Sequence, residues 1–345
     1  MKVSVIVVNW NRRDLLRACL QSLGSQVFTD FEVIVVDNGS TDGSAEMVAR
    51  EFHSARSIVN RENRGFCAAN NQGIKASSAD FIALLNNDAE AEPGWLAALS
   101  AAFEGRPDFG MAASKILVWE DPSRIDKAAH LIYPDGQNRG RGSGEPDRGQ
   151  YDRLLEDALW PDGCAAMYRR EMLDSIGGFD EDLFAYADDA ELGLRARIAG
   201  WRCVYAPAAV VRHHRGATLG LGSARRLELI ERNRVLLAAK LFPWSLLWLN
   251  LPYYLARILS GAWEAMRGRG EASLYPGVKG KLTMALSLLR GDCQALLLLP
   301  RMLRKRREIA SFRKLSAGQV RELILGSRIS LRELSRQTTV GANDR

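Results

Sequence analysis

The strongest constraint on the fold is an alternation between β-branched apolar runs and segments in which apolar residues recur at helical spacing. The three apolar runs are VSVIVVN (3–9), FEVIVVDN (31–38) and DFIALLNND (80–88). Continuously apolar strands that are separated by helices are typical of a parallel sheet covered on both faces. We therefore predict an α/β fold built on a mostly parallel sheet.

The segments between and after these runs predict the other elements. Apolar residues recur at helical spacing over residues 12–23, and Thr41 and Asp42 can cap a helix over 45–52. We also expect a short strand near 57–60, helices over 65–77 and from Pro93, a helix ending at Ser175, a helix from about Asp188, and a strand over 201–206.

Residues 133–150 (YPDGQNRGRGSGEPDRGQ) have a different composition from the segments around them. They are rich in glycine, proline and charge and almost lack apolar side chains. This composition predicts a mobile loop, and long loops often serve as lids over a site.

Charge divides the chain into two parts. Residues 236–345 carry 19 Lys+Arg against 7 Asp+Glu, whereas residues 1–235 carry 28 against 34. The whole chain of 345 residues has a formal net charge of +6 and an ordinary hydrophobic content of 47%. We therefore expect a mildly acidic catalytic or binding domain over 1–235 and a basic region over 236–345 that seeks an anionic partner.

Several classes of protein lack support in this sequence. The five cysteines have no CxxC spacing, so we expect reduced thiols rather than a disulfide framework or a zinc site. The apolar run at the N-terminus is too short for a signal peptide, which predicts a location on the cytosolic side. No GxGxxG follows the first apolar run and no GxxxxGK[ST] occurs, which argues against dehydrogenases and P-loop proteins.

Polar side chains follow the apolar runs at the point where each run ends. Asn9, Asp37 and Asp88 fall at the carboxyl ends of predicted strands, where sheets of this kind bind their ligands. Asp37 can accept a hydrogen bond from the imide N–H of uracil or thymine, although an Asx turn explains it equally well. Asp88, with Asn86 on the same face, suits Mg²⁺ or Mn²⁺, which prefer hard oxygen ligands. A capping arrangement before the helix at Pro93 is the alternative for Asp88.

Six stretches, in this order, resemble glycosyltransferase family 2 and especially its bacterial rhamnosyltransferase-like branch. They are VSVIVVNWN, VVDNGSTDGS, NRGFCAANNQGI, LLNNDAEAEPGWL, GGFDEDLFAYADDAELGLRARIAGW and HHRGAT, and the resemblance covers roughly residues 1–235. It implies a GT-A fold, a nucleoside-diphosphate sugar donor, a divalent metal (Mg²⁺ or Mn²⁺) and inversion at the anomeric carbon.

The resemblance also implies roles for individual residues. Asn86-Asn87-Asp88 stands where the family has its DxD motif, so Asp88 would bind the metal. Asp37 would read the nucleobase, Asp189 would be the catalytic base, and His213 would contact the metal or a phosphate. The other residues that the resemblance places around the donor are Asn9, Asn11, Ser40, Asn63, Arg64, Gly65, Asn71, Asn87, Gly163 and Cys164.

Simpler explanations stay open for the last two motifs. Asp188, Asp189 and Glu191 would also favour a helix N-terminus without any catalytic role. His213 belongs to an H-x-x-G-x-[ST] pattern that ends at Thr218, and the adjacent His214 is the alternative contact.

The basic region predicts an association with membranes. Residues 241–263 are dense in leucine, tryptophan and tyrosine, but Pro243, Pro252 and Arg257 argue against a plain transmembrane helix. With the basic run at 304–307, the pattern favours amphipathic helices in the interface of an anionic leaflet. A buried helical subdomain or a homodimer interface is the alternative. We expect no nucleic-acid partner, because the basic residues are interleaved with leucine and tryptophan.

The prediction is an inverting glycosyltransferase of cell-envelope glycan synthesis at the cytoplasmic face of the inner membrane, peripheral or monotopic. It would move a sugar, with rhamnose as the candidate, from a dTDP- or UDP-linked donor to a lipid-linked or polysaccharide acceptor. Two alternatives are a catalytically silent nucleotide-sugar-binding relative and a nucleotidyltransferase, which would release pyrophosphate.

Overall fold

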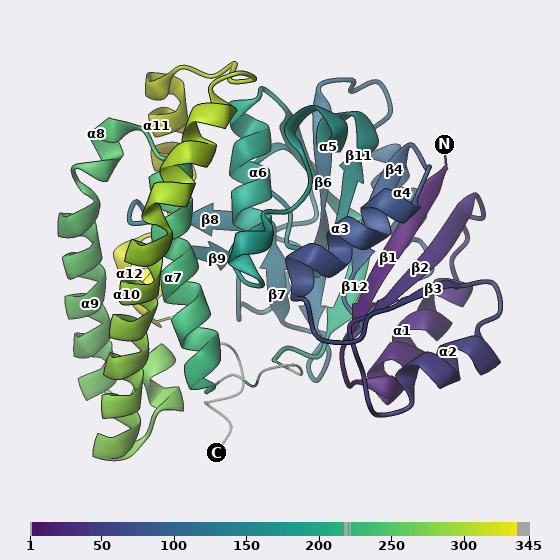
Figure 1. The fold of residues 1–345 in the computed structure, drawn as a ribbon, viewed down its shortest axis with the longest axis horizontal. Coiled ribbons are helices and arrows are strands. Elements are labelled where there is room, and N and C mark those ends of the chain that lie inside the picture. The colour runs from purple at the N-terminus through teal and green to yellow at the C-terminus, as the bar shows by residue number, and fades with distance from the viewer. Residues whose placement is uncertain (1, 217–219, 221, 337–345) are drawn as a thin grey trace. The chain divides into compact units, whose positions relative to one another are not determined.

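The computed structural model describes residues 2–216, 220 and 222–336, and the chain divides into two compact units. The first unit comprises Met1–Ala129 and Glu145–Thr218, and the second comprises His130–Gly144 and Leu219–Arg345. Figure 1 shows the order of the elements along the chain. The predicted boundary at residues 235/236 falls inside helix α7 (Ala224–Leu241), and the division into a catalytic domain and a basic region stays a prediction.

The first unit contains the predicted parallel strands. They are β1 (Val3–Asn9), β2 (Phe31–Asp37), β3 (Arg56–Val59) and β4 (Phe81–Leu85), which lie in the spatial order β4-β1-β2-β3. All three of these pairings are parallel. Asn9 pairs in register with Asp37, so the two predicted polar strand ends are neighbours.

Beyond β4 the sheet is mixed, because a strand that the sequence analysis did not predict enters in the opposite direction. This strand, β11 (Ala165–Arg169), lies antiparallel between β4 and β6 (Phe109–Val118). β12 (Arg202–His213) runs parallel to β6 and is longer than the predicted strand over 201–206. The remaining strands of this sheet pair antiparallel with β12 or β6, and they are β5 (Ala89–Ala91), β7 (Ile125–Ala128) and β10 (Leu155–Ala158).

Helices cover both faces of the parallel strands. Alternate residues of a strand point to opposite faces. Val5 and Val7 belong to the core that also contains the buried residues of α1 (Arg13–Gly24), α2 (Ser44–Glu51) and α4 (Trp95–Ala101). Ile6 points the other way, against Gly73 of α3 (Phe66–Ala76). Helix α4 begins at Trp95 and not at Pro93, because the chain before it is held extended as strand β5.

Two further helices of the first unit position the later motifs. α5 (Arg170–Ile176) follows β11, and α6 (Asp188–Ile198) begins at the predicted residue. A 3-10 turn, η1 (Glu181–Leu183), precedes α6.

The second unit shows that the prediction for 133–150 is wrong in part. Residues 138–140 form strand β9, which pairs with β8 (His130–Ile132), and Tyr133, Asp135 and Gln137 are buried. The buried Asp135 carboxylate accepts a hydrogen bond from Gln137 N at 2.9 Å and pairs with Arg257 at 2.5 Å. The polar residues of this segment are therefore satisfied by protein partners, which composition alone does not reveal.

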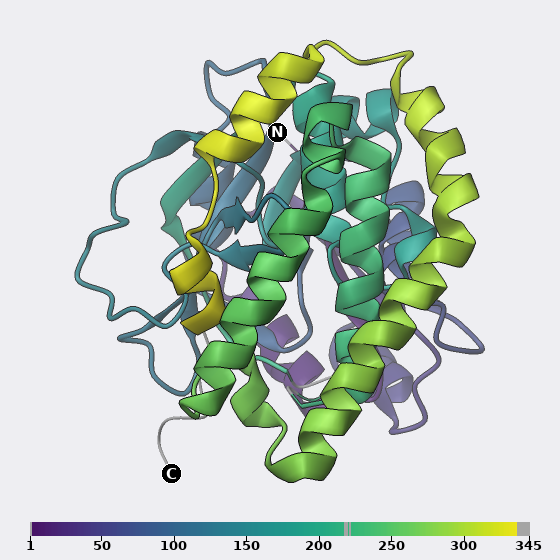
Figure 2. The same cartoon turned by 90° about the vertical axis from the view of Figure 1, so that its left-hand side faces the viewer.

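The rest of the second unit is helical (Figure 2). Its elements are α7, α8 (Trp244–Leu247), α9 (Asn250–Met266), η2 (Glu271–Leu274), α10 (Gly277–Ile309), α11 (Ala317–Gly326) and α12 (Leu331–Arg336). The stretch 241–263 is divided between the end of α7, α8 and α9. α7 ends before Pro243, which caps α8.

Candidate functional site

The carboxyl ends of β1 and β2 form a hydrogen-bonded group of polar side chains. Asn9 Nδ2 donates to Asp37 Oδ2 at 3.1 Å and to Ser40 Oγ at 3.2 Å. Asn9 and Asp37 are almost fully buried. Asp37 Oδ1 also accepts from Ser40 N at 2.8 Å, so the turn that was the alternative explanation is present as well.

Two more predicted residues join this group. Asn11, with a positive φ of 52°, donates its backbone N–H to Ser40 Oγ at 2.9 Å and accepts from Thr41 N at 2.7 Å. Asn87 Nδ2 donates to Asn9 Oδ1 at 2.7 Å and thereby ties the end of β4 to the end of β1. The structure thus brings together residues of three separate motifs that the sequence resemblance assigns to binding of the sugar donor.

The segment 63–65 is connected to the end of β2 through Asn38, which sequence reasoning missed. Asn38 Nδ2 donates to Asn63 Oδ1 at 2.9 Å, and its Oδ1 accepts from Arg64 N at 3.0 Å. Gly65 has a φ of +86°, and a Cβ there would lie 2.5 Å from the Phe184 ring. Asn38 directly follows the predicted strand end Asp37, so its position was the signal that could have identified it.

Asn71 has a different environment from the other predicted residues. Its side-chain amide donates to Phe179 O at 2.9 Å and to Glu181 Oε1 at 3.0 Å. Its Oδ1 accepts from Phe179 N at 2.8 Å. These bonds hold the loop ahead of α6 against α3, and they do not join Asn71 to the group around Asp37.

Asp88 is a buried carboxylate, and one of its oxygens accepts no hydrogen bond within the described part of the chain; Glu264 in the second unit also has such an oxygen. Among the residues that the structure describes, Asp88 Oδ1 is buried and has no hydrogen-bond partner. It lies 3.4 Å from His213 Nε2, because β12 extends to His213 beside β5. Burial acts to raise the pKa of Asp88, but the nearby charge of His213 outweighs it, so the pKa lies below its usual value.

His213 is oriented by a residue that sequence reasoning did not single out. Asp126 on β7 is fully buried, and its Oδ2 lies 2.7 Å from His213 Nδ1. The other oxygen of Asp126 pairs with Arg215. Because one ring nitrogen is held by a carboxylate, the other is directed toward Asp88. No motif or spacing in the stretch around Asp126 carried a signal for this role.

The alternative histidine has other neighbours. The His214 ring stacks on Trp119 with a centroid distance of 4.1 Å, and its nitrogens lie 3.7 and 3.8 Å from Glu90 and Glu120. Its backbone N–H donates to Asp88 O at 2.9 Å. The side chain of His213 rather than that of His214 therefore faces Asp88. Thr218, the last residue of this motif, lies outside the described residues.

The acid pair at the start of α6 follows a strained loop. Phe184, Tyr186 and Ala187 all have positive φ values, of 65°, 70° and 54°. Such conformations are costly for residues other than glycine and often occur at functional sites. This loop places Asp188 in a buried position, whereas Asp189 is half-buried.

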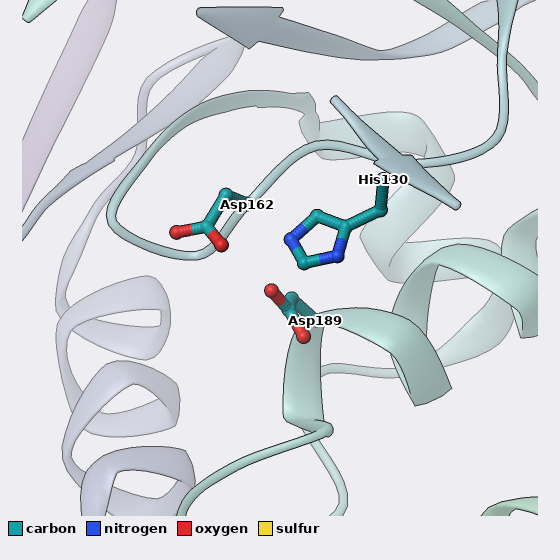
Figure 3. Close-up of side chains that lie close together, drawn as sticks. All are labelled: His130, Asp162 and Asp189. Atoms are coloured by element: carbon teal, nitrogen blue, oxygen red, sulfur yellow. The ribbon is translucent and has the colours of Figure 1, made fainter. Parts of the chain in front are cut away.

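The carboxylates of this pair differ in environment. Burial, and then the charge of Asp189, raise the pKa of Asp188 to about 8. Asp189 Oδ2 accepts from Gly163 N at 3.2 Å. Carboxylate oxygens of Asp189 and Asp162 lie within 4.8 Å of each other (Figure 3). Glu191, by contrast, is fully buried and paired with Arg195 at 2.8 Å, which is a structural role.

The turn 162–164 connects the acid pair with the end of β4. Cys164 N donates to Asp162 Oδ1 at 2.9 Å, and Cys164 O accepts from Asn86 N at 2.8 Å. Lys127 Nζ lies 2.5 Å from Asp162 Oδ2. Burial raises the pKa of the Cys164 thiol, which disfavours the nucleophilic thiolate form. The turn thus positions Gly163 and Asp189 beside residues 86–88, which follow β4.

Comparisons with known proteins identify the family of this chain. Residues 4–177 match the family model "Glycosyl transferase family 2". The N-acetylglucosaminyl-diphospho-decaprenol L-rhamnosyltransferase of Mycobacterium tuberculosis is 27% identical over 243 residues, which cover 65% of this chain and 79% of that protein. The uncharacterized protein y4gI of Sinorhizobium fredii is 31% identical over 63% of this chain, and the match spans only 25% of its length.

A solved structure shows the same fold. The crystal structure of GalNAc-T7 with UDP, GalNAc and Mn²⁺ aligns with a TM-score of 0.57 at 14% identity, covering 90% of this chain and 57% of that one. The predicted fold class, a GT-A glycosyltransferase fold with a helical C-terminal region, is confirmed.

Proposed function

This chain belongs to glycosyltransferase family 2, and on that premise we propose that it transfers a sugar from a nucleoside diphosphate to a hydroxyl group with inversion. The observation that carries the proposal is the unused, buried Asp88 Oδ1, which lies 3.4 Å from His213 Nε2. This pair stands beside the hydrogen-bonded group around Asp37.

Asp88 and His213 would hold the divalent metal. A carboxylate oxygen and an imidazole nitrogen suit Mn²⁺, and Mg²⁺ fits the oxygen-rich part of the same set. The metal, when bound, would stabilise the negative charge on the departing diphosphate. Asn86 contributes no charge where the family has an acid, so Asp88 would be the main anionic ligand from this motif.

Asp37 and Asn9 would select the nucleobase. Asp37 offers carboxylate oxygens at the end of β2, and Asn9 holds one of them at 3.1 Å. A carboxylate can accept the imide N–H that uracil and thymine share, which supports a UDP- or dTDP-linked donor. The name of the mycobacterial relative supports rhamnose as the sugar.

Asp189 would be the catalytic base. A sugar hydroxyl is a weak nucleophile, so a positioned carboxylate must take its proton as the attack proceeds. Because the pKa of Asp188 is raised to about 8, Asp188 stays protonated near neutral pH. Asp189, which accepts a hydrogen bond from Gly163 N at 3.2 Å, is then the residue of the pair that would take the proton. A single base and a direct displacement give inversion.

The acceptor would be a lipid-linked or polysaccharide glycan of the cell envelope. The mycobacterial relative is named for a lipid diphosphate acceptor, which supports the lipid-linked alternative. An acceptor of this kind would place the enzyme at the cytoplasmic face of the membrane, as a peripheral or monotopic protein.

The test is a thermal-shift screen of nucleotide sugars with and without Mn²⁺ or Mg²⁺, followed by product analysis. A ligand that binds the folded protein raises Tm. We expect a metal-dependent rise with a UDP- or dTDP-sugar and release of the nucleoside diphosphate. Release of pyrophosphate would instead identify a nucleotidyltransferase, and binding without any turnover would identify a silent relative.

A further inference from the structure

We propose that α9 and α10 form one face of the second unit that inserts into an anionic leaflet in the plane of the membrane, without spanning it. The proposal deepens the membrane association proposed above by naming the surface, the partner and the orientation. Figure 2 shows α9 and α10 inclined to each other, and Tyr254 of α9 links them by donating a hydrogen bond to Asp292 of α10 at 3.0 Å.

Helix α9 is apolar on its exposed side and polar on its buried side. Its polar buried side includes Glu264, which is 5% exposed, and Arg257, which pairs with Asp135 and Glu231. Its outward stripe recurs every three or four residues and continues the exposed Trp248: Leu251 63%, Leu255 50%, Leu259 70%, Trp263 53% and Met266 75% exposed.

Helix α10 has the same reversed pattern. The side that packs on α7 carries mostly small residues, such as Ser287, Gly291 and Ala295, all of which are buried. A Cβ at Gly291 would lie 2.7 Å from Glu228 O, so the two helices are in close contact. Its opposite side is exposed and apolar: Val278 87%, Leu282 58%, Leu286 42%, Leu289 60%, Leu296 60% and Leu297 82% exposed.

This pattern is the reverse of what water requires. A surface helix of a soluble protein turns its apolar stripe inward and its charges outward. The most apolar window of α10 has a mean hydropathy of 1.4, yet only 17% of it is buried inside the structure. A core helix of that hydropathy would be mostly buried. The apolar stripe of α10 must therefore be shielded from water by something outside this chain.

The charges beside the apolar stripe favour anionic lipid, rather than a second copy of this chain, as the partner that shields it. Lys279, Arg290 and Arg301 are exposed, and their spacing of about three helical turns places them along one edge of the α10 stripe, where Arg290 also lies 3.6 Å from Glu228. The acidic Asp292 is instead held by Arg234 at 3.3 Å. Two copies placed face to face would bring like charges together, whereas anionic headgroups would neutralise them.

The packing of α10 argues against a transmembrane span. Asp292 lies in the middle of α10, and its partners Arg234 and Tyr254 belong to α7 and α9. A span would carry this pair, together with the buried Glu231 of α7, into the hydrocarbon, where charged groups are costly. Insertion of the outward stripe alone, to about 5–10 Å, leaves these charges in the protein.

The first experiment measures binding of the full-length chain to vesicles of phosphatidylcholine with and without phosphatidylglycerol. We expect cosedimentation with the anionic vesicles that weakens with salt, and a blue shift of tryptophan fluorescence. The double variant Leu259→Glu with Leu296→Glu should reduce binding by about tenfold or more, because both side chains would insert. The matched control is Val27→Glu with Val59→Glu, at positions 68% and 60% exposed in the first unit, and should bind as wild type does.

Cys293 supplies a native probe of the same face. It is exposed, whereas Cys19, Cys67, Cys164 and Cys203 are buried. A membrane-impermeant maleimide should label Cys293 in solution, and anionic vesicles should protect it. In a Cys293→Ser background, Lys279→Cys and Arg307→Cys at the two ends of α10 should show the same degree of protection when the reagent is added outside sealed vesicles. Protection of only one end would mean that the helix spans and would overturn the in-plane orientation.

Other outcomes distinguish this inference from the proposed function. If wild type binds nucleotide sugars but not anionic vesicles, the membrane face is wrong while the enzymatic proposal stands. Vesicle binding without any binding of donor would overturn the enzymatic proposal alone. A dimer in solution that the Leu259→Glu and Leu296→Glu changes dissociate, with no vesicle binding, would assign the face to a second copy.

Discussion

Each unit of this protein buries an aspartate, and the two aspartates differ in how their oxygens are used. Asp135 in the second unit is 0% exposed, and both of its oxygens have partners, Gln137 N at 2.9 Å and Arg257 Nε at 2.5 Å. Asp88 in the first unit is 5% exposed, and its Oδ1 has no hydrogen-bond partner among the described residues.

Burial alone therefore does not identify a site. A buried oxygen without a partner suggests a ligand where a second ligating side chain lies beside it, as His213 does beside Asp88. Glu264 Oε2 in the second unit also lacks a partner within the described ranges, but the other oxygen of Glu264 pairs with Arg336 at 3.3 Å.

The neighbours of Asp135 are also paired with oppositely charged side chains. Glu231 pairs with Arg234 at 2.6 Å and with Arg257 at 2.9 Å, and Arg234 also reaches Asp292 at 3.3 Å. In this network three carboxylates pair with two guanidinium groups inside the second unit. Such a network is expected to hold the fold together, and the polar group at the sheet edge of the first unit is expected to bind and react.

The largest expected effect is on catalysis at that edge. Asp189→Asn should reduce transfer by about 10²–10⁴-fold, because an amide cannot take the acceptor's proton. Donor binding, measured by thermal shift, should be retained. Asp174→Asn, an exposed acid on α5, is the matched control and should transfer normally. Wild-type turnover in Asp189→Asn would reject the assignment of the base.

Substitutions in the ion-pair network around Asp135 should change stability rather than catalysis. Arg257→Ala should lower the free energy of unfolding by about 3–5 kcal/mol, because it leaves Asp135 and Glu231 buried without their partner. Urea unfolding measures this. Arg56→Ala, which removes an exposed pair with Glu32 at 3.4 Å, should cost no more than about 1 kcal/mol. Equal losses in the two variants would contradict the distinction between the network and ordinary surface pairs.

The direct test of the comparison is the same substitution in both units. Asp88→Asn should abolish the rise in Tm caused by Mn²⁺ with donor, yet leave the metal-free Tm close to that of wild type. Asp135→Asn should lower the metal-free Tm and leave the Mn²⁺-dependent rise intact. If both variants lose only stability, Asp88 is a structural carboxylate like Asp135.

A smaller effect is expected one step away from the metal ligands. Asp126→Asn should weaken Mn²⁺ binding by about 10–100-fold, because the neutral amide holds His213 Nδ1 less firmly. Titration of the Mn²⁺ EPR signal measures the affinity without any turnover. Asp121→Asn changes a half-buried acid in the loop ahead of β7 that pairs with Arg124 at 3.0 Å, and this variant should bind Mn²⁺ as wild type does. An unchanged affinity in Asp126→Asn would mean that His213 is positioned by other contacts.

The smallest effect is a change in pH dependence. The pKa of Asp188 is raised to about 8 in the folded state, against about 4 for an unperturbed aspartate. Between these values the folded state holds a proton that the unfolded state has lost, so stability should fall as pH rises. Asp188→Asn resembles the protonated acid and should remove this part of the slope in thermal melts from pH 5 to about pH 8. A slope identical to that of wild type would show that Asp188 ionises normally.

Much of the first unit could be predicted because its signals are local. β1 and β2 were expected from β-branched runs, and their parallel register then brings Asn9 beside Asp37. The start of α6 at Asp188 agreed with the prediction, since an acidic cluster precedes a helical pattern. Periodicity within a short window is sufficient for such elements.

The remaining parts depend on which distant segments pair. β11 enters the sheet antiparallel between β4 and β6, and β12 extends to His213 because β5 and β6 pair with it. Asp126 becomes a partner of His213 across 87 positions of sequence. No short-range pattern encodes such a contact.

The sequence by itself determined the alternation of strands and helices, the polar strand ends Asn9, Asp37 and Asp88, and the strong positive charge of the C-terminal region. Only the tertiary structure decided that Asp88 faces His213, that residues 130–144 belong with the C-terminal helices, and that α9 and α10 turn their apolar sides outward. The physical reason is that the sequence pattern records only how apolar each position is. The partner that covers a position, whether strand, helix or membrane, is set by contacts between residues far apart in the chain.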